Sequence, residues 1–143
     1  MKRLTITLTC LLIAISLFAQ DGKHRFSPEK FQAELEAYVI DKAQLTQQET
    51  TRFLPLFREM HKKQRVIYSQ QRQVCKCKPT DEAGYREAIR KNDQMDLEIK
   101  TLQQTYHEKF LNVLPASKVF EVIKAENRFH REMWKKWGHK KNK

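Results

Sequence analysis

Glycine and proline are scarce in this chain, and long stretches contain neither of them. The 143 residues include only 3 glycines and 4 prolines, the two residues that interrupt helices most strongly. Apolar residues recur every three or four positions over several long runs, which is the spacing of one helical face, and strand-like alternation is absent. The sequence therefore predicts an all-α protein of four helices.

Start signals define the first two helices. A serine, a proline and a glutamate in succession suit the cap and first turn of a helix expected over residues 27–43. Thr46 and Glu49 have the spacing of a capping box, so a second helix is expected from there to about residue 74. Pro55 lies inside this helix, and its missing N–H and ring clash predict a kink.

The second half of the chain predicts two further helices. Residues 75–79 break the second helix, and a third helix is expected over residues 80–113, with Thr80 at its cap. A fourth is expected from residue 114 to Gly138, where glycine suits a helix end. The second and third helices are long and similar in length, so we expect them to form an antiparallel hairpin within a thin bundle.

Each long helix carries an apolar stripe that we expect to form the core. The stripe of the second helix includes Phe57 and Ile67, and that of the third begins at Tyr85 and Ile89. Phe129 belongs to the stripe of the last helix. Facing stripes of this kind predict one modest core and one domain.

The first 19 residues have the features of a secretory signal peptide. Two cations precede an apolar run, and Ala19 supplies the small residue at a cleavage site. An uncleaved anchor is the alternative, because Leu17 is larger than the cleavage enzyme prefers. We therefore expect a periplasmic protein with a signal peptide at residues 1–19, a loose extension at residues 20–26, and a helical domain at residues 27–138 followed by a basic tail at residues 139–143.

Positive charge dominates the chain and concentrates near its C-terminus. Lys and Arg number 28 against 17 Asp and Glu. An exported protein does not meet chromosomal nucleic acid, so this charge points to unfolded or acidic proteins or to an anionic membrane surface, unless it serves only solubility. Two aromatic residues three apart exceed what the last turn of a small bundle can bury, so we expect a partner-binding site at Trp134, Lys135, Lys136 and Trp137.

Cys75 and Cys77 are the one pair of residues that suggests metal or redox chemistry. They can form a disulfide, bind Zn(II) or Cu(I), or remain free loop thiols, and their spacing does not decide between these states. A zinc site needs four ligands, so His61 and His107 would have to approach them. No other cofactor is expected.

Catalytic motifs are absent from the sequence. No Gly-rich phosphate loop, nucleophile elbow or zinc-protease motif occurs. The five histidines are scattered, and we expect them to face solvent. These observations predict a protein that is not an enzyme.

Two segments, residues 45–49 (LTQQE) and residues 114–118 (LPASK), resemble the LTXXQ motif of the Spy/CpxP-like periplasmic proteins. Both segments begin a predicted helix. The chain also resembles a branch of that family common in Bacteroidetes, whose members are described as periplasmic heavy-metal sensors or sensors of extracytoplasmic sigma factors. The literal matches are Leu45, Thr46 and Leu114, whereas Glu49, Pro115 and Lys118 depart from the motif.

This resemblance implies a cradle-like antiparallel homodimer that acts as an ATP-independent chaperone or as an envelope-stress adaptor. Its partners would be unfolded or acidic proteins, or a membrane sensor or anti-sigma regulator. The alternative function is a metal-responsive periplasmic sensor that uses Cys75 and Cys77 to regulate a membrane partner. A third interpretation is attachment to anionic headgroups through the C-terminal tryptophans and lysines.

Overall fold

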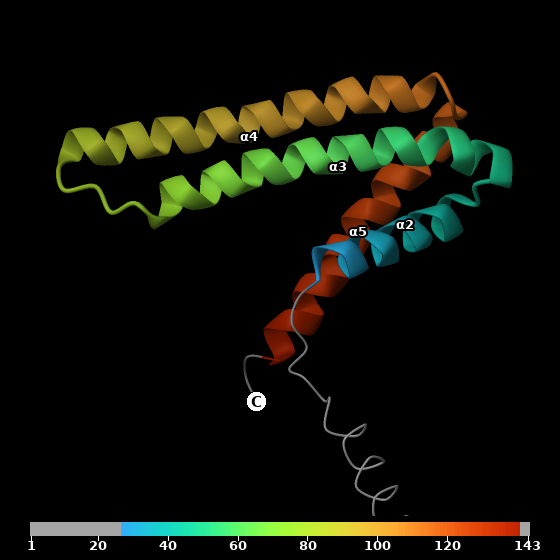
Figure 1. Cartoon of the computed structure of the whole chain (residues 1–143), viewed down its shortest axis with the longest axis horizontal. Helices are drawn as coiled ribbons and strands as arrows, with labels where there is room; N and C mark the ends of the chain where they lie inside the picture. Colours follow the sequence, from blue (N-terminus) through green and yellow to red (C-terminus); the bar gives the residue numbers. More distant parts are fainter. Residues whose placement is uncertain (1–26, 141–143) are drawn as a thin grey trace, which may run out of the picture. The chain divides into compact units, whose positions relative to one another are not determined.

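The computed structural model of the chain describes residues 27–140, with side chains described for residues 27–136. It is all-α, and the described residues contain no strand (Figure 1). The four helices are α2 (Pro28–Ala43), α3 (Gln47–Lys76), α4 (Glu82–Leu111) and α5 (Ala116–Lys140). The prediction of a four-helix all-α protein is confirmed.

The chain divides after Ala33, and residues from Glu34 onward form one compact unit. The predicted signal peptide and N-terminal extension, residues 1–26, lie outside the described residues. Among the described helices, none has the length and hydropathy needed to cross a bilayer.

Local hydrogen bonds explain where the two long helices begin. The Thr46 hydroxyl accepts a hydrogen bond from the backbone N–H of Glu49 at 3.3 Å, and the Glu49 carboxylate accepts one from the N–H of Thr46 at 2.8 Å. This is the predicted capping box, and it satisfies two N–H groups that the helix itself cannot pair. The α4 cap is Asp81, one residue later than the predicted Thr80, because its carboxylate accepts from the N–H of Gly84 at 2.8 Å.

Pro55, where a kink was predicted, and Gly138, where a helix end was predicted, both lie inside helices. Pro55 lies within α3, which continues through it as a single helix to Lys76. Gly138 was expected to end the last helix, but α5 extends two residues further, to Lys140. No glycine of the described residues has a positive φ angle, so Gly138 does not adopt the left-handed conformation of a helix end.

The core lies where α5 and the C-terminal part of α2 meet the half of the α3–α4 hairpin that is far from its connecting loop. Its centre is aromatic: the ring of Phe53 lies 5.1 Å from that of Phe57 and 5.0 Å from that of Phe110. The other large side chains that are fully buried are Leu35, Val39, Met60, Tyr106 and Val122. The predicted stripes of α3 and α5 therefore form the core.

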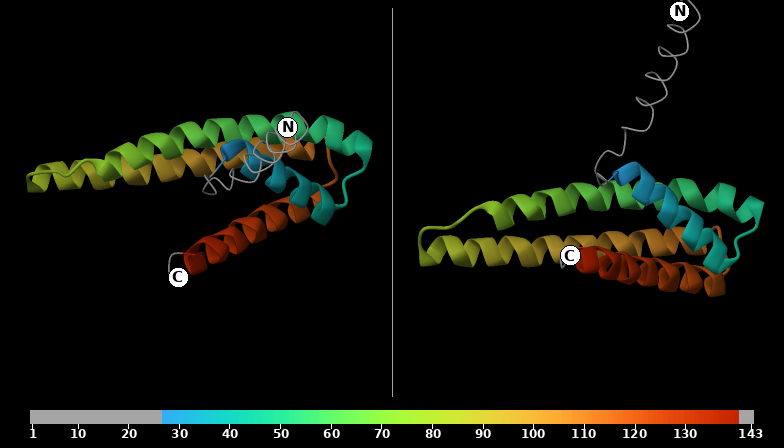
Figure 2. Two further views of the ribbon diagram at one scale, coloured as in Figure 1. Left: turned by 60° about the horizontal axis from the view of Figure 1, so that its bottom comes forward. Right: turned by 90° about the horizontal axis from the view of Figure 1, so that it is seen from below.

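Helices α3 and α4 lie side by side and antiparallel, joined by the short connection before Glu82 (Figures 1 and 2). The prediction that the α4 stripe is buried from its beginning was wrong, because Tyr85 is 53% exposed and Ile89 63% exposed. The buried residues of α4 begin only at Ile99. Nearer the connection, the two helices meet through polar groups, such as the Gln71 amide that donates to the Asp96 carboxylate at 2.7 Å.

Candidate functional site

The two motif-like segments meet in the structure. The Lys118 ammonium forms an ion pair with the Glu49 carboxylate and donates a hydrogen bond to the backbone carbonyl of Gln44 at 3.0 Å. Hydrogen bonds from Lys118 and from the backbone of Thr46 lower the pKa of Glu49 to about 2. The fifth residues of the two segments, both departures from the motif, are thus direct partners.

The remaining motif residues lie at the helix starts, where they contribute to the core or to the turns. Leu114 is buried in the core. The Pro115 carbonyl accepts from the N–H of Lys118 at 2.9 Å and of Val119 at 3.1 Å, so it begins α5. Leu45 closes the turn after α2, where its N–H donates to the carbonyl of Ile40 at 3.1 Å.

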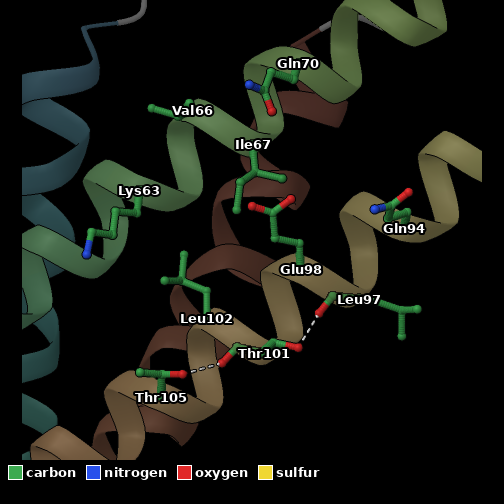
Figure 3. Close-up of a pocket in the computed structure, with 10 residues that line it drawn as sticks. All are labelled: Lys63, Val66, Ile67, Gln70, Gln94, Leu97, Glu98, Thr101, Leu102 and Thr105. Atoms are coloured by element: carbon green, nitrogen blue, oxygen red, sulfur yellow. Dashed lines mark hydrogen bonds between the residues drawn. The ribbon is translucent and has the colours of Figure 1, made fainter.

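A groove of about 750 Å³ runs between α3 and α4 (Figure 3). Val66 and Leu97 line it and are 55% and 69% exposed. The hydroxyls of Thr101 and Thr105 donate to backbone carbonyls of their own helix, each at 2.9 Å. The other residues that line the groove are Lys63, Ile67, Gln70, Gln94, Glu98 and Leu102.

This groove was missed by sequence reasoning. Val66 and Leu97 lie outside the stripes that predicted the core, and single exposed apolar residues are common on protein surfaces. The available signal was the stripe residue Ile67, which is the sequence neighbour of Val66 and lines the same groove. Chemically, the groove combines four apolar side chains with six polar or charged ones, which suits binding of a mixed apolar and polar segment.

A buried polar cluster lies on the core side of α3. His61 is only 8% exposed, so the prediction that the histidines face solvent was wrong for this residue. Its Nε2 atom lies 3.5 Å from the carboxylate of Glu126, and the Nε2 atom of His130 lies 3.8 Å from the same oxygen. Burial lowers the pKa of His61, with the Glu126 charge acting in the opposite direction.

The two cysteines lie at the end of α3, beside the connection to α4. Both are exposed free thiols, and the Sγ atom of Cys75 lies 3.9 Å from the side-chain oxygen of Asn92. In the described part of the chain, no group of three or more His, Cys, Asp or Glu residues is placed to hold a metal ion. His61 is fourteen residues from Cys75 on the same helix, which corresponds to about 21 Å. The His107 ring lies beside Phe110, near the other end of the hairpin.

The predicted partner-binding residues lie near the end of α5. Trp134 is 73% exposed, and Lys135 and Lys136 are exposed as well. The side chain of Trp137 lies outside the described residues. The described members of this group are therefore accessible to a partner.

Comparison of the chain with protein-family models, curated proteins and solved structures found no match. The family resemblance accordingly rests on the residues quoted for it, chiefly the segments at residues 45–49 and 114–118.

Proposed function

We propose that this protein is a non-enzymatic binding protein of the periplasm, an ATP-independent chaperone or envelope-stress adaptor of Spy/CpxP type that works as a homodimer. The observation that carries the proposal is the open groove between α3 and α4, with Val66 and Leu97 exposed along it. Unfolded or acidic proteins are the proposed clients, and a membrane sensor or anti-sigma regulator is the proposed partner of an adaptor.

The chemistry of the groove suits weak and reversible holding. Full burial of a Val or Leu side chain stabilises a complex by about 1.5–3 kcal/mol, so two such contacts retain a client without trapping it. The surplus of Lys and Arg over Asp and Glu favours rapid encounter with acidic chains. Neither effect needs a nucleotide, because capture and release depend only on how much apolar surface the client exposes.

The contact between Glu49 and Lys118 supports the family part of the proposal. Glu49 and Lys118 each differ from the motif, yet they form an ion pair that links the start of α3 to the start of α5. The two motif-like segments therefore adjoin each other in the fold.

The test measures light scattering from an unfolding client protein with the chain added at near-equal ratio, without ATP. We expect suppression that weakens when salt is added. The variant Val66→Ser/Leu97→Ser should suppress less, whereas a matched control at exposed apolar residues elsewhere, Ile89→Ser/Leu111→Ser, should behave like the unmodified protein. Absence of suppression by the unmodified protein, or full suppression by the groove variant, would contradict the proposal.

The alternative function is a metal-responsive sensor that acts on a membrane partner. It is favoured by one observation, the exposure of both Cys75 and Cys77 at the end of α3, where a metal ion reaches them without unfolding. The remaining ligands would come from a second copy of the chain or from the partner. Uptake of Zn(II) or Cu(I) that disappears in Cys75→Ser/Cys77→Ser would support this function, and equal uptake by the variant would reject it.

A further inference from the structure

The outer face of α5 carries aromatic and basic side chains in a single row. Successive helical residues are about 100° apart, so Lys124, Arg131, Trp134 and Lys135 all lie within about 60° of Phe120 around the helix axis. All five are exposed, Phe120 by 61% and Trp134 by 73%. We call these five residues the basic-aromatic stripe.

The opposite face of α5 is buried, so the basic-aromatic stripe faces away from the core. Val122 is fully buried, and Val119, Ala125 and Phe129 are between 4% and 6% exposed. The helix is therefore apolar on one side because it packs into the core. The aromatic residues on its other side are not explained by packing within the chain.

Two of the three described carboxylates of α5 lie away from the stripe. Glu126 is buried beside His61, and Glu132 lies 3.5 Å from the hydroxyl of Tyr38 on α2. Glu121 lies at the edge of the stripe, where it pairs with Lys124 at 2.9 Å. Arg131 and Lys135 thus present positive charge between and beside the two aromatic rings.

We propose that the basic-aromatic stripe docks α5 lengthwise on an anionic lipid surface. Helices that lie in a membrane interface combine cations, which meet anionic headgroups, with aromatic rings that enter the boundary with the acyl chains. Phe120 and Trp134 are fourteen residues apart, or about 21 Å along the helix. Two ring anchors with cations between and beside them suit a flat, extended negative surface better than a compact pocket on a protein. This attachment is independent of client binding by the groove.

The test measures cosedimentation of the full chain with phosphatidylcholine vesicles that contain or lack phosphatidylglycerol. We expect binding only to the anionic vesicles, and binding that weakens as salt is added. Each cation near such a surface strengthens binding about fivefold, so Lys124→Gln/Arg131→Gln/Lys135→Gln should bind on the order of a hundredfold more weakly.

The matched control removes the same charge from exposed positions of α3, in Lys62→Gln/Arg72→Gln/Lys76→Gln. It should retain most of the binding. Any contribution of residues 1–26 to vesicle binding is the same in all variants. Circular dichroism checks that each variant is folded. Equal loss in the stripe variant and the control would overturn the proposal, because the binding would then depend only on net charge.

A second measurement reports ring insertion. Trp134 becomes the sole tryptophan in Trp137→Phe, since the chain has two. Its fluorescence should shift to the blue with anionic vesicles and be quenched by brominated acyl chains. If the stripe instead serves an acidic protein, polyglutamate will compete fully while brominated lipid leaves Trp134 unquenched, and that result would overturn the proposal.

Discussion

The Lys118 ammonium and the Glu49 carboxylate form an ion pair that joins the first turn of α5 to the first turn of α3. The same Glu49 carboxylate completes the capping box by accepting from the N–H of Thr46, and Lys118 also binds the Gln44 carbonyl. One pair of side chains therefore couples a local helix start to a contact between residues sixty-nine positions apart. Loss of either partner leaves the other mostly buried without its counter-charge.

Stability should follow a definite order in variants of this pair. Lys118→Gln and Glu49→Gln should each lower the thermal unfolding midpoint, because each leaves an uncompensated charge. The double variant Glu49→Gln/Lys118→Gln should lose less than the two single losses added, since the two amides can bond to each other. A double-mutant cycle by thermal denaturation measures the coupling, and strictly additive losses would show that the pair does not interact.

Acid should remove the contribution of Glu49 in a defined range. Its pKa falls from 4.5 to about 2 on folding, so the folded state favours the charged carboxylate. The resulting stability is complete above pH 4.5 and is lost as the pH falls from 4.5 toward 2. Urea unfolding across this range should show a shallower pH dependence in Glu49→Gln than in the unmodified chain.

His61 should add a second, separate loss of stability near neutral pH. Burial lowers its pKa below 6.5, so the unfolded chain binds a proton more readily than the folded one. Its contribution is therefore complete above pH 6.5 and falls as the pH drops from 6.5 through the lowered value. The charged or titratable groups that act on it are Glu126 and His130 on α5, Glu36 on α2, and Arg65 on its own helix.

The measurement is the urea midpoint on either side of pH 6.5. The variant His61→Leu should flatten the change because it has no proton to bind. A pH dependence that survives unchanged in His61→Leu would assign it to other groups.

The core also predicts which substitutions matter most. Phe57 is fully buried and contacts the rings of Phe53 and His61, so Phe57→Ala should lower the free energy of unfolding by about 3–5 kcal/mol. Trp134→Ala, at an exposed ring, should change it by less than about 0.5 kcal/mol. Chemical denaturation of the two variants checks this contrast, and similar losses in both would contradict the described burial.

The parts of this structure that the sequence predicts well are those with local causes. The capping box needs only Thr46 and Glu49, and the stripe containing Phe57 follows from helical spacing. The burial of His61 was not predictable in this way, because it depends on Glu126, a residue of another helix. The exposure of Ile89 likewise depends on where the core ends along α4.

The candidate site shows the same division. In the sequence, Lys118 could be recognised only as a second residue that differs from the motif. Its contact with Glu49 was not predictable, because it depends on how the helices pack. The groove beside Val66 required both hairpin helices in register before it could be recognised. The exposure of Trp134 was predicted from its position, whereas the sequence left the state of Cys75 and Cys77 open.

The turn between α2 and α3 offers a final prediction about backbone strain. Gln44 has a φ angle of 48°, the left-handed conformation that favours glycine, and it ends α2 with hydrogen bonds from its own N–H to Asp41 and from Leu45 to Ile40. Gln44→Gly should raise the free energy of unfolding by about 0.5–1 kcal/mol, because it relieves the strain and keeps the carbonyl that Lys118 binds.

The matched control for this change is Gln48→Gly, four residues later in the first turn of α3. Glycine there has no strain to relieve and weakens the helix, so it should lower the free energy of unfolding by up to about 1 kcal/mol. Urea denaturation of both variants gives opposite signs if the left-handed residue at position 44 is a source of strain. A loss of stability in both variants would instead mean that the Gln44 side chain contributes more than its backbone conformation costs.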